Sequence, residues 1–273
     1  MIPNTRGLVA GLVQFTVSGR TWDCMTSGPA PIPAETVCEG SLCAIRPSSF
    51  GVRPRCVLVV EKEAVFGRLV GAGLCSRVPS VLVTGRGYPD HATRAFAVAL
   101  RRAFDVPVFG LCDCDPDGIR ILLCYARGSS PGRTTTRRRR KGVCPGERAG
   151  VAGDAVRMGY ANTLPGLQWL GLRPSALGSL LLHNSSHNTH SQRLSPRDRA
   201  VLEGIAAGND GGYAQLSQRA MAEVRAMGAE GGRKVELEGL GDDLPRAVEG
   251  MLLGRDWVPL LGEQQAEGGE EHL

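Results

Sequence analysis

Three short, almost purely apolar runs divide the first half of the sequence: residues 56–60 (CVLVV), 80–84 (SVLVT) and 107–112 (PVFGLC). A strand that is apolar on both faces is typical of the middle of a parallel sheet, because helices cover both sides of such a sheet. The three runs therefore predict buried strands that lie side by side.

The segments between these runs carry a helical pattern. Residues 61–71 and 117–125 are expected to be helical, and residues 89–104 give the clearest pattern in the chain. The apolar stripe of that last helix is formed by Ala95, Phe96, Val98, Ala99 and Ala103. A β-α-β-α-β-α order at short spacing predicts right-handed crossovers and an α/β fold, with a parallel sheet flanked by helices.

The ends of the chain differ from this middle part. Residues 7–17 and 21–25 can pair as a small N-terminal β element around a turn at Ser18-Gly19. Residues 26–55 are rich in Pro, Gly and Ser and are expected to be mostly irregular. We therefore divide the chain into residues 1–50, a main domain over 51–261, and an acidic tail over 262–273 that is expected to be disordered.

A basic, low-complexity insertion interrupts the main domain at about residues 128–157. After it, regular structure is expected again over residues 168–172, 198–207, 213–227, 234–240 and 242–251. Inside the insertion, residues 137–141 (RRRRK) form either a nuclear localisation signal, a phosphate-binding segment or a solvated loop.

Composition sets broad limits on function. The net charge of +5 permits a polyanionic partner without establishing one. No apolar stretch is long enough to span a bilayer. The chain has nine Cys and no CxxC pair, which indicates free thiols in a reducing, intracellular compartment.

Three carboxylates follow the apolar runs at the points where the strands end. Glu61 comes directly after the first run, Asp113 directly after the third, and Asp115 two residues later. Functional groups of an open α/β sheet gather at the carboxyl ends of its strands, so these side chains are expected to meet. Like charges at close range repel each other, and Mg²⁺ relieves this by binding hard oxygen ligands.

A simpler interpretation of the same acids stays open. Asp is a good N-cap, so Asp113 and Asp115 could merely begin the next helix. Pro116 is expected to keep Asp115 out of the helical region, and Gly118 to let the backbone pass close to a ligand. The combination of Glu61 with DCDPDG after two apolar strands favours the metal site.

These motifs resemble a known family. Residues 57–70, 81–96 and 111–129 are similar to the toprim domain of the topoisomerase VI A-type subunits. They are still more similar to that of their eukaryotic relative, the meiotic transesterase that makes the double-strand breaks initiating recombination. Shorter matches lie at residues 6–11, 23–24, 169–175 and 234–245. The resemblance assigns residues 51–261 to a toprim-like domain of the topoisomerase VI A type.

The resemblance also implies a chemistry. It makes Glu61, Asp113 and Asp115 the Mg²⁺ ligands of a DNA transesterase. The implied enzyme class is that of the type IIB, ATP-hydrolysing DNA topoisomerases. In that family a tyrosine attacks a DNA phosphate and forms a 5′-phosphotyrosyl link. The implied partners are double-stranded DNA, a second copy or related A-type subunit, and a topoisomerase VI B-like ATPase subunit. The implied location is the nucleus, with no membrane contact.

The nucleophile does not carry over. The family places its catalytic tyrosine on a winged-helix domain before the toprim domain, and we expect this sequence to lack that domain. The tyrosines at positions 88, 125, 160 and 213 have no matching catalytic context, and Tyr88 corresponds to a family tyrosine that is not the nucleophile. No catalytic residue is therefore assigned.

Weaker assignments and alternatives remain. Lys62, Arg86 and Arg94 are candidate contacts to DNA phosphates, each against an ordinary surface role. Three other functions stay open: a non-catalytic DNA-binding paralogue, a toprim nuclease or primase-like enzyme, and a nucleotide-binding α/β module.

Overall fold

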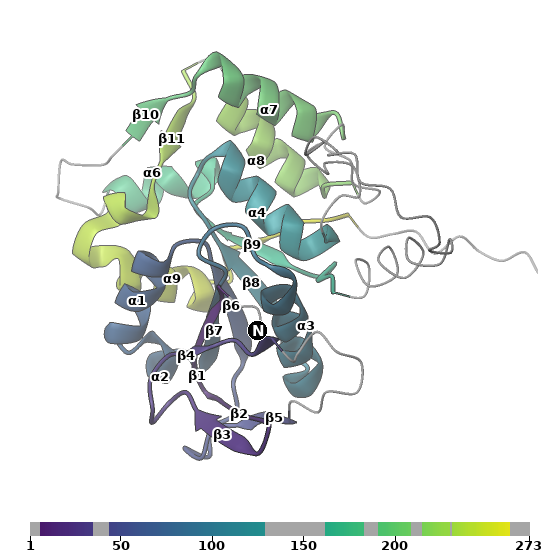
Figure 1. Cartoon of the computed structure of the whole chain (residues 1–273). Coiled ribbons are helices and arrows are strands. Elements are labelled where there is room, and N and C mark those ends of the chain that lie inside the picture. Colours follow the sequence, from purple (N-terminus) through teal and green to yellow (C-terminus); the bar gives the residue numbers. More distant parts are fainter. Residues whose placement is uncertain are drawn as a thin grey trace, which may run out of the picture.

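A computed structural model of the chain describes residues 6–34, 44–128, 162–182, 191–208, 215–229 and 231–262. The fold is α/β, as expected, and is built on a seven-stranded sheet in the order β12-β9-β8-β6-β7-β1-β4. The four central strands β9, β8, β6 and β7 run parallel, whereas β12, β1 and β4 add antiparallel edges. Helices α1, α2 and α9 lie on one side of the sheet, and α3 and α4 on the other (Figure 1).

The strands of the main sheet are β1 (Leu8–Gly11), β4 (Ala30–Pro31), β6 (Cys56–Val60), β7 (Ser80–Thr84), β8 (Val108–Leu111), β9 (Gln168–Gly171) and β12 (Val258–Pro259). A second sheet has three strands: β2 (Val13–Val17), β3 (Arg20–Asp23) and β5 (Ala44–Pro47). A third has two strands: β10 (Ser191–Arg193) and β11 (Arg233–Val235).

The helices are α1 (Glu63–Gly71), α2 (Leu74–Arg77), α3 (His91–Phe104), α4 (Pro116–Arg127), α6 (Pro174–Leu182), α7 (Pro196–Ala206), α8 (Gln218–Gly228) and α9 (Leu244–Leu253). A 3₁₀ segment, η2 (Leu237–Asp243), precedes α9.

The central strands are buried on both faces, which confirms the interpretation of the apolar runs. Every residue of β6, β7 and β8 is buried. Strand β6 lies between β7 and β8, with Val60 opposite Thr84 on one side and Leu111 on the other. Helix α4 packs so closely on β8 that only glycine fits at position 110 without a shift of its neighbours. A Cβ there would lie 2.5 Å from a methyl carbon of Leu122. This register places the ends of β6 and β8 side by side.

The N-terminal β element is partly merged with the main sheet. Strand β1 pairs with β7, whereas β2, β3 and β5 form a separate antiparallel sheet that packs on α3 through Phe15 and Phe96. Within the described residues of 26–55, β4 and β5 form where irregular structure was expected, because each pairs with an earlier strand of the chain. Asp23 fastens the loop after β5, accepting hydrogen bonds from Ser48 Oγ and Ser49 N.

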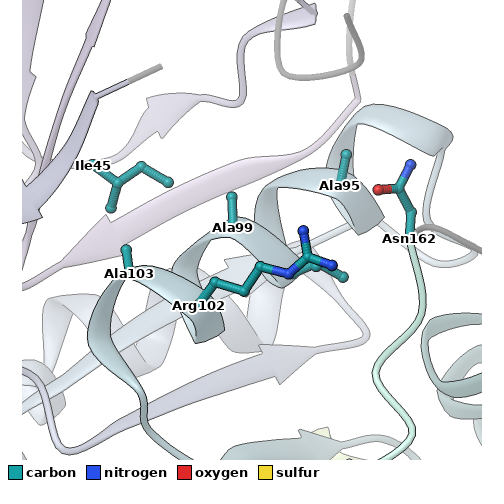
Figure 2. A pocket seen from close by; sticks show the side chains of 7 residues that line it. Ile45, Ala95, Ala99, Arg102, Ala103 and Asn162 are labelled. Atoms are coloured by element: carbon teal, nitrogen blue, oxygen red, sulfur yellow. The ribbon is translucent and has the colours of Figure 1, made fainter. Parts of the chain in front are cut away.

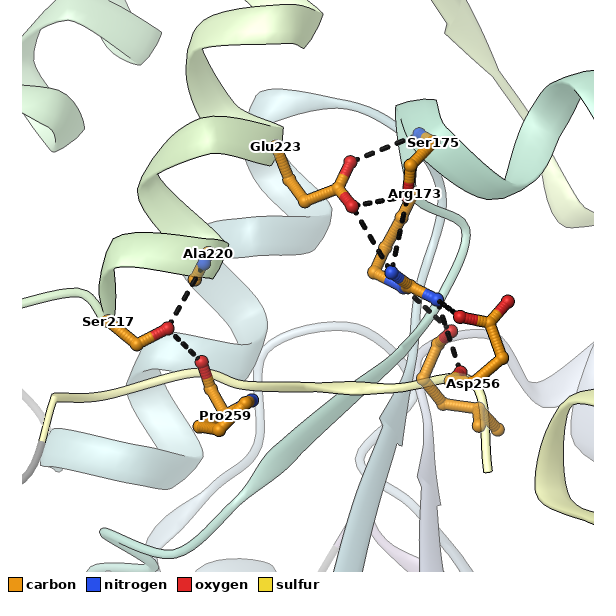
Figure 3. Close-up of polar contacts among 8 residues, drawn as sticks. Arg173, Ser175, Ser217, Ala220, Glu223, Asp256 and Pro259 are labelled. Atoms are coloured by element: carbon orange, nitrogen blue, oxygen red, sulfur yellow. Dashed lines mark hydrogen bonds and ion pairs between the residues drawn. The ribbon is translucent and has the colours of Figure 1, made fainter. Parts of the chain in front are cut away.

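The C-terminal half is held to the sheet by a buried arginine (Figure 3). Arg173 is 2% exposed and donates to Glu223 of α8 at 3.1 Å, while a second guanidinium nitrogen contacts Asp256. Glu223 also accepts from the backbone N–H of Ser175 at the start of α6. These contacts fix α8 and the segment before β12 against the end of β9.

Two sequence features lie outside the described residues. They are the greater part of the basic insertion, including residues 137–141, and the acidic tail after residue 262. Among the described residues, none of the helices has the length and apolar character of a membrane span. The six cysteines in those residues, at positions 24, 56, 75, 112, 114 and 124, are all free thiols.

Candidate metal and DNA site

Glu61 stands at the carboxyl end of β6 and is fixed by both neighbouring strands. Its backbone N–H donates to Leu111 O at 3.0 Å, and its carbonyl accepts from Gly87 N at 2.9 Å. Its side-chain Oε2 accepts from the backbone N–H of Asp113 at 3.0 Å. The carboxylate therefore lies directly over the turn that follows β8, as its position after the strand predicts.

The turn after β8 carries Asp113 and Asp115. Asp113 is 4% exposed, and its Oδ1 accepts from the backbone N–H of Leu237 at 2.9 Å. Asp115 is extended, as expected before Pro116, and its Oδ1 caps α4 by accepting from Gly118 N at 2.7 Å. The N-cap interpretation is thus realised for one oxygen of Asp115, which leaves the carboxylate further lone pairs for other ligands.

Gly118 is required by the turn itself. A Cβ at this position would lie 2.6 Å from the carbonyl oxygen of Asp113. We expected this glycine to admit a ligand to the backbone, but the close neighbour is the protein's own chain. The tight turn keeps Asp113 and Asp115 at the end of the sheet.

Burial and mutual repulsion raise the pKa values of these acids. Burial, and then the charge of Asp113, raise the pKa of Glu61 from 4.5 to about 7, although its hydrogen bond from Asp113 N–H opposes this. The pKa of Asp113 is also raised, mainly by burial and against the hydrogen bond from Lys62. Burial raises the pKa of Asp115 as well. Carboxyl groups that resist ionisation gain most from a nearby cation.

A cation from the chain itself already lies in this cluster. Lys62 Nζ is 2.7 Å from Asp113 Oδ2, 2.8 Å from Glu238 Oε2 and 3.5 Å from Glu236 Oε2. Burial lowers the pKa of Lys62, but its hydrogen bonds to Asp113 and Glu238 outweigh that effect and raise the pKa overall. Lys62 therefore stays an ammonium ion.

The two glutamates of this contact were not singled out from the sequence. They flank Leu237 in a segment that joins the acidic turn as a short antiparallel bridge, with Cys114 N–H donating to Val235 O at 2.9 Å. The alternation of charged and apolar residues in KVELEGL is the one sequence signal for them. It predicts an extended segment with its glutamates on one side, but it cannot say which strand end receives it.

The carboxylates of Glu61, Asp113 and Asp115 are the kind of ligand that suits a hard divalent cation, although the structure does not hold them in a complete coordination geometry. Carboxylate oxygens are the ligands that Mg²⁺ takes, and the Glu61 carboxylate contacts the backbone N–H of Asp113. In the described part of the chain, no three His, Cys, Asp or Glu side chains are close enough to hold a metal ion as they stand. Ligation by Glu61, Asp113 and Asp115 together stays a prediction.

The candidate DNA contacts fall into different environments. Lys62 points to the acidic cluster, as described above. Arg86 lies at the surface in the loop after β7, where its guanidinium donates to Glu63 at 2.7 Å. Arg94 is 4% exposed within α3, so a direct contact with phosphate would require its guanidinium to leave the protein interior. Arg86 is therefore the best placed of the three to meet DNA.

The tyrosines within the described residues do not resemble an activated nucleophile. Tyr125 is 2% exposed, and burial raises its pKa further. Tyr88 is 51% exposed, and its hydroxyl donates to Asp117 at 3.3 Å. Burial, and then the charge of Asp117, raise the pKa of Tyr88 to about 12. Tyr160 and Tyr213 lie outside the described residues.

One hollow of about 440 Å³ lies along the outer face of α3 (Figure 2). It is lined mainly by small apolar side chains of that helix, together with Ile45, Arg102 and Asn162. None of the three candidate metal ligands lines it. The hollow is therefore separate from the acidic cluster.

Comparison with known proteins supports the resemblance. A family model for the toprim domain shared by Spo11 and the A-type subunits of topoisomerase 6 matches residues 56–140. The meiotic recombination protein SPO11 of Homo sapiens is 29% identical over 206 residues, covering 75% of this chain and 44% of that protein.

Two plant proteins show the same relationship. The meiotic recombination protein SPO11-1 of Arabidopsis thaliana is 38% identical over 123 residues, covering 45% of this chain and 32% of that protein. The A-type subunit of DNA topoisomerase 6 from the same plant is 30% identical over 179 residues, covering 65% of this chain and 35% of that protein. The chain spans less than half the length of each of these three relatives.

Proposed function

Because the chain belongs to the family of Spo11 and the topoisomerase 6 A-type subunits, we propose that its residues 51–261 are the toprim part of a DNA-cleaving transesterase of meiotic recombination. The observation that carries this proposal is the 3.0 Å contact between Glu61 Oε2 and the backbone N–H of Asp113. It joins the ends of two parallel strands and places the Glu61 carboxylate against the backbone of the turn that carries Asp113 and Asp115. The raised pKa of each carboxyl group supports the same view.

Glu61, Asp113 and Asp115 would hold a Mg²⁺ ion through their carboxylate oxygens. The ion, when bound, would neutralise a DNA phosphate and stabilise the charge that develops during P–O bond exchange. The backbone bonds of Glu61 fix the end of β6, and the N-cap bond of Asp115 fixes the start of α4, so both ligands project from fixed points at the edge of the sheet. Arg86 would position a neighbouring phosphate from the adjoining loop.

The reaction itself needs a tyrosine from outside the described residues. Its hydroxyl oxygen would bond to the phosphorus, the bond from phosphorus to the 3′ oxygen would break, and the 3′ oxygen would take up a proton. The product is a 5′-phosphotyrosyl link. A related A-type subunit that carries the tyrosine would supply it beside this metal site. The further partner would be a topoisomerase VI B-like ATPase subunit, and the location the nucleus.

Calorimetric titration of the full chain with Mg²⁺ tests the metal site directly. We expect the D113N/D115N variant to lose Mg²⁺ binding, because it removes two of the three charged ligands. The matched control is Glu63→Gln, which removes a carboxylate that is 51% exposed and paired with Arg86. Equal Mg²⁺ binding by D113N/D115N and the unchanged chain contradicts the proposal.

Trapping with DNA separates the proposed function from its alternatives. We expect a covalent complex with DNA 5′ ends only when Mg²⁺ and a tyrosine-bearing A-type subunit of the family are both present. Metal-dependent nicking by this chain alone, without a covalent complex, would identify a toprim nuclease. DNA binding that never leads to cleavage with any such subunit would identify a non-catalytic paralogue.

A further inference from the structure

Lys62 directly follows a candidate metal ligand and occupies the middle of the acidic cluster. It is the N-cap residue of α1, and its side chain is 28% exposed. Three carboxylates lie within 4 Å of its ammonium group: Asp113, Glu236 and Glu238. Surface ion pairs usually join one cation to one anion, so this surplus of acid around a single lysine calls for an explanation.

Lys62 and a divalent ion would need the same oxygen. Asp113 Oδ1 is taken by the backbone N–H of Leu237 at 2.9 Å, and Oδ2 by Lys62 at 2.7 Å. Asp113 is 4% exposed, so its carboxylate has no free approach from solvent on another side. A metal ion that binds Asp113 must therefore displace the ammonium group, because two cations that share one buried carboxylate repel each other.

The two glutamates give the displaced lysine a destination. Glu238 Oε2 is 2.8 Å from the ammonium group, and Glu236 Oε2 is 3.5 Å away. Their side chains are 32% and 48% exposed, so both have room to follow the lysine towards solvent. Lys62 can therefore leave Asp113 while keeping a favourable ion pair.

We propose that Lys62 is a built-in competitor for the metal: it neutralises Asp113 when no metal is bound, and transfers to Glu236 and Glu238 when a divalent ion arrives. The proposal rests on the proposed function, because it requires a divalent ion at Glu61 and Asp113. It makes Lys62 a positioning residue that sets metal affinity. It also couples metal binding to the segment that carries both glutamates.

A merely structural ion pair predicts the opposite response to substitution. If Lys62 only fastens the start of η2 to α1, its loss disorders the site and weakens metal binding. If Lys62 competes with the metal, its loss frees Asp113 and increases the local negative charge, so metal binding becomes tighter. The sign of the change in affinity therefore separates the two roles.

The experiment is calorimetric titration of the full chain with Mg²⁺ in the absence of DNA. We expect Lys62→Gln to bind Mg²⁺ roughly tenfold more tightly, the size expected for losing one charged hydrogen bond of the competitor. Lys62→Arg keeps the competing charge and should stay within about threefold of the unchanged chain. The charge-matched control is Arg77→Gln. It removes one positive charge and breaks the 2.7 Å ion pair between Arg77 of α2 and Glu249 of α9, and it should leave Mg²⁺ affinity unchanged.

Thermal unfolding provides a second readout. In EDTA we expect Lys62→Gln to unfold at a lower temperature than the unchanged chain, since Asp113 has lost its partner. Added Mg²⁺ should raise the melting temperature of Lys62→Gln by more than that of the unchanged chain. A variant that is unfolded in EDTA should refold with Mg²⁺, and its failure to do so contradicts the proposal.

Two results overturn different claims. Weaker or equal Mg²⁺ binding by Lys62→Gln, in a preparation where the unchanged chain binds Mg²⁺, refutes the competitor role alone. No Mg²⁺ binding by the unchanged chain and by Lys62→Gln refutes the proposed metal site itself.

Discussion

Replacing Glu61 by glutamine should stabilise the protein, because the buried carboxylate is held against its own preference. The amide keeps the size of the side chain and can still accept the hydrogen bond from Asp113 N–H. It removes the negative charge that burial and Asp113 oppose. The variant therefore mimics the protonated form of Glu61 at every pH.

The expected gain follows from the pKa of Glu61, which is raised from 4.5 to about 7. A raised pKa means that the folded state binds the proton more tightly than the unfolded state, so stability is full below pH 4.5 and falls as the pH rises through 7. This difference between the folded and unfolded pKa of Glu61 lowers the free energy of unfolding by at most roughly 3 kcal/mol at alkaline pH, and Glu61→Gln should recover that amount. For a chain of this size it equals a rise in melting temperature of roughly 5–10 °C.

The assay is thermal or urea unfolding of both proteins in EDTA at pH 8 and at pH 4.5. Glu61→Gln should be more stable at pH 8, and the difference should vanish at pH 4.5, where Glu61 of the unchanged chain is protonated. Added Mg²⁺ at pH 8 should stabilise the unchanged chain and leave the variant nearly unaffected. The control is Glu63→Gln, whose exposed pair with Arg86 is worth at most about 1 kcal/mol.

Two outcomes would refute this reasoning. One is a Glu61→Gln variant no more stable than the unchanged chain at pH 8 without metal, since the carboxylate would then be adequately solvated. The other is an advantage of equal size at both pH values, since it would come from packing and not from ionisation.

Three further changes test other parts of the fold. Arg173→Ala should cost about 3–5 kcal/mol in urea unfolding, because it leaves the buried Glu223 without its guanidinium partner. Gly110→Ala should cost about 1–3 kcal/mol in the same assay, since its methyl group would lie 2.5 Å from Leu122. Burial raises the pKa of Asp23, but the hydrogen bonds to its carboxylate outweigh burial and lower the pKa from 3.8 to about 2. Asp23→Asn should therefore lower the free energy of unfolding by about 1 kcal/mol at pH 7, after allowance for solvent screening. That cost should shrink as the pH falls from 3.8 towards 2, because the unchanged carboxylate then becomes protonated.

The sheet could be predicted from the sequence because its strands are defined locally. A run such as CVLVV is apolar at every position, and only a strand covered on both faces suits it. The end of that run then places Glu61 without any knowledge of the rest of the chain. Edge strands such as β4 and β5 lack this signal, because short segments form strands only when a distant partner is present.

The composition of the acidic site was only half predictable, for the same reason. Asp113 and Asp115 follow a local pattern of strand, turn and helix, and the structure has that turn. Glu236 and Glu238 reach the site from more than a hundred residues further along the chain. No pattern near these glutamates in the sequence predicts Lys62 as their ion-pair partner, so only the folded chain shows the contact.

Glu61 connects the two loops on which the proposed chemistry depends. Its carbonyl accepts from Gly87 N–H in the loop after β7, which also carries Arg86, and its carboxylate accepts from Asp113 N–H in the turn after β8. Because β6 lies between β7 and β8, its end adjoins both of these loops. A shift of the Arg86 loop towards DNA would therefore pull on the backbone of Glu61 and, through its side chain, on Asp113. DNA binding and metal binding at this edge of the sheet should consequently be coupled, even where the two ligands do not touch.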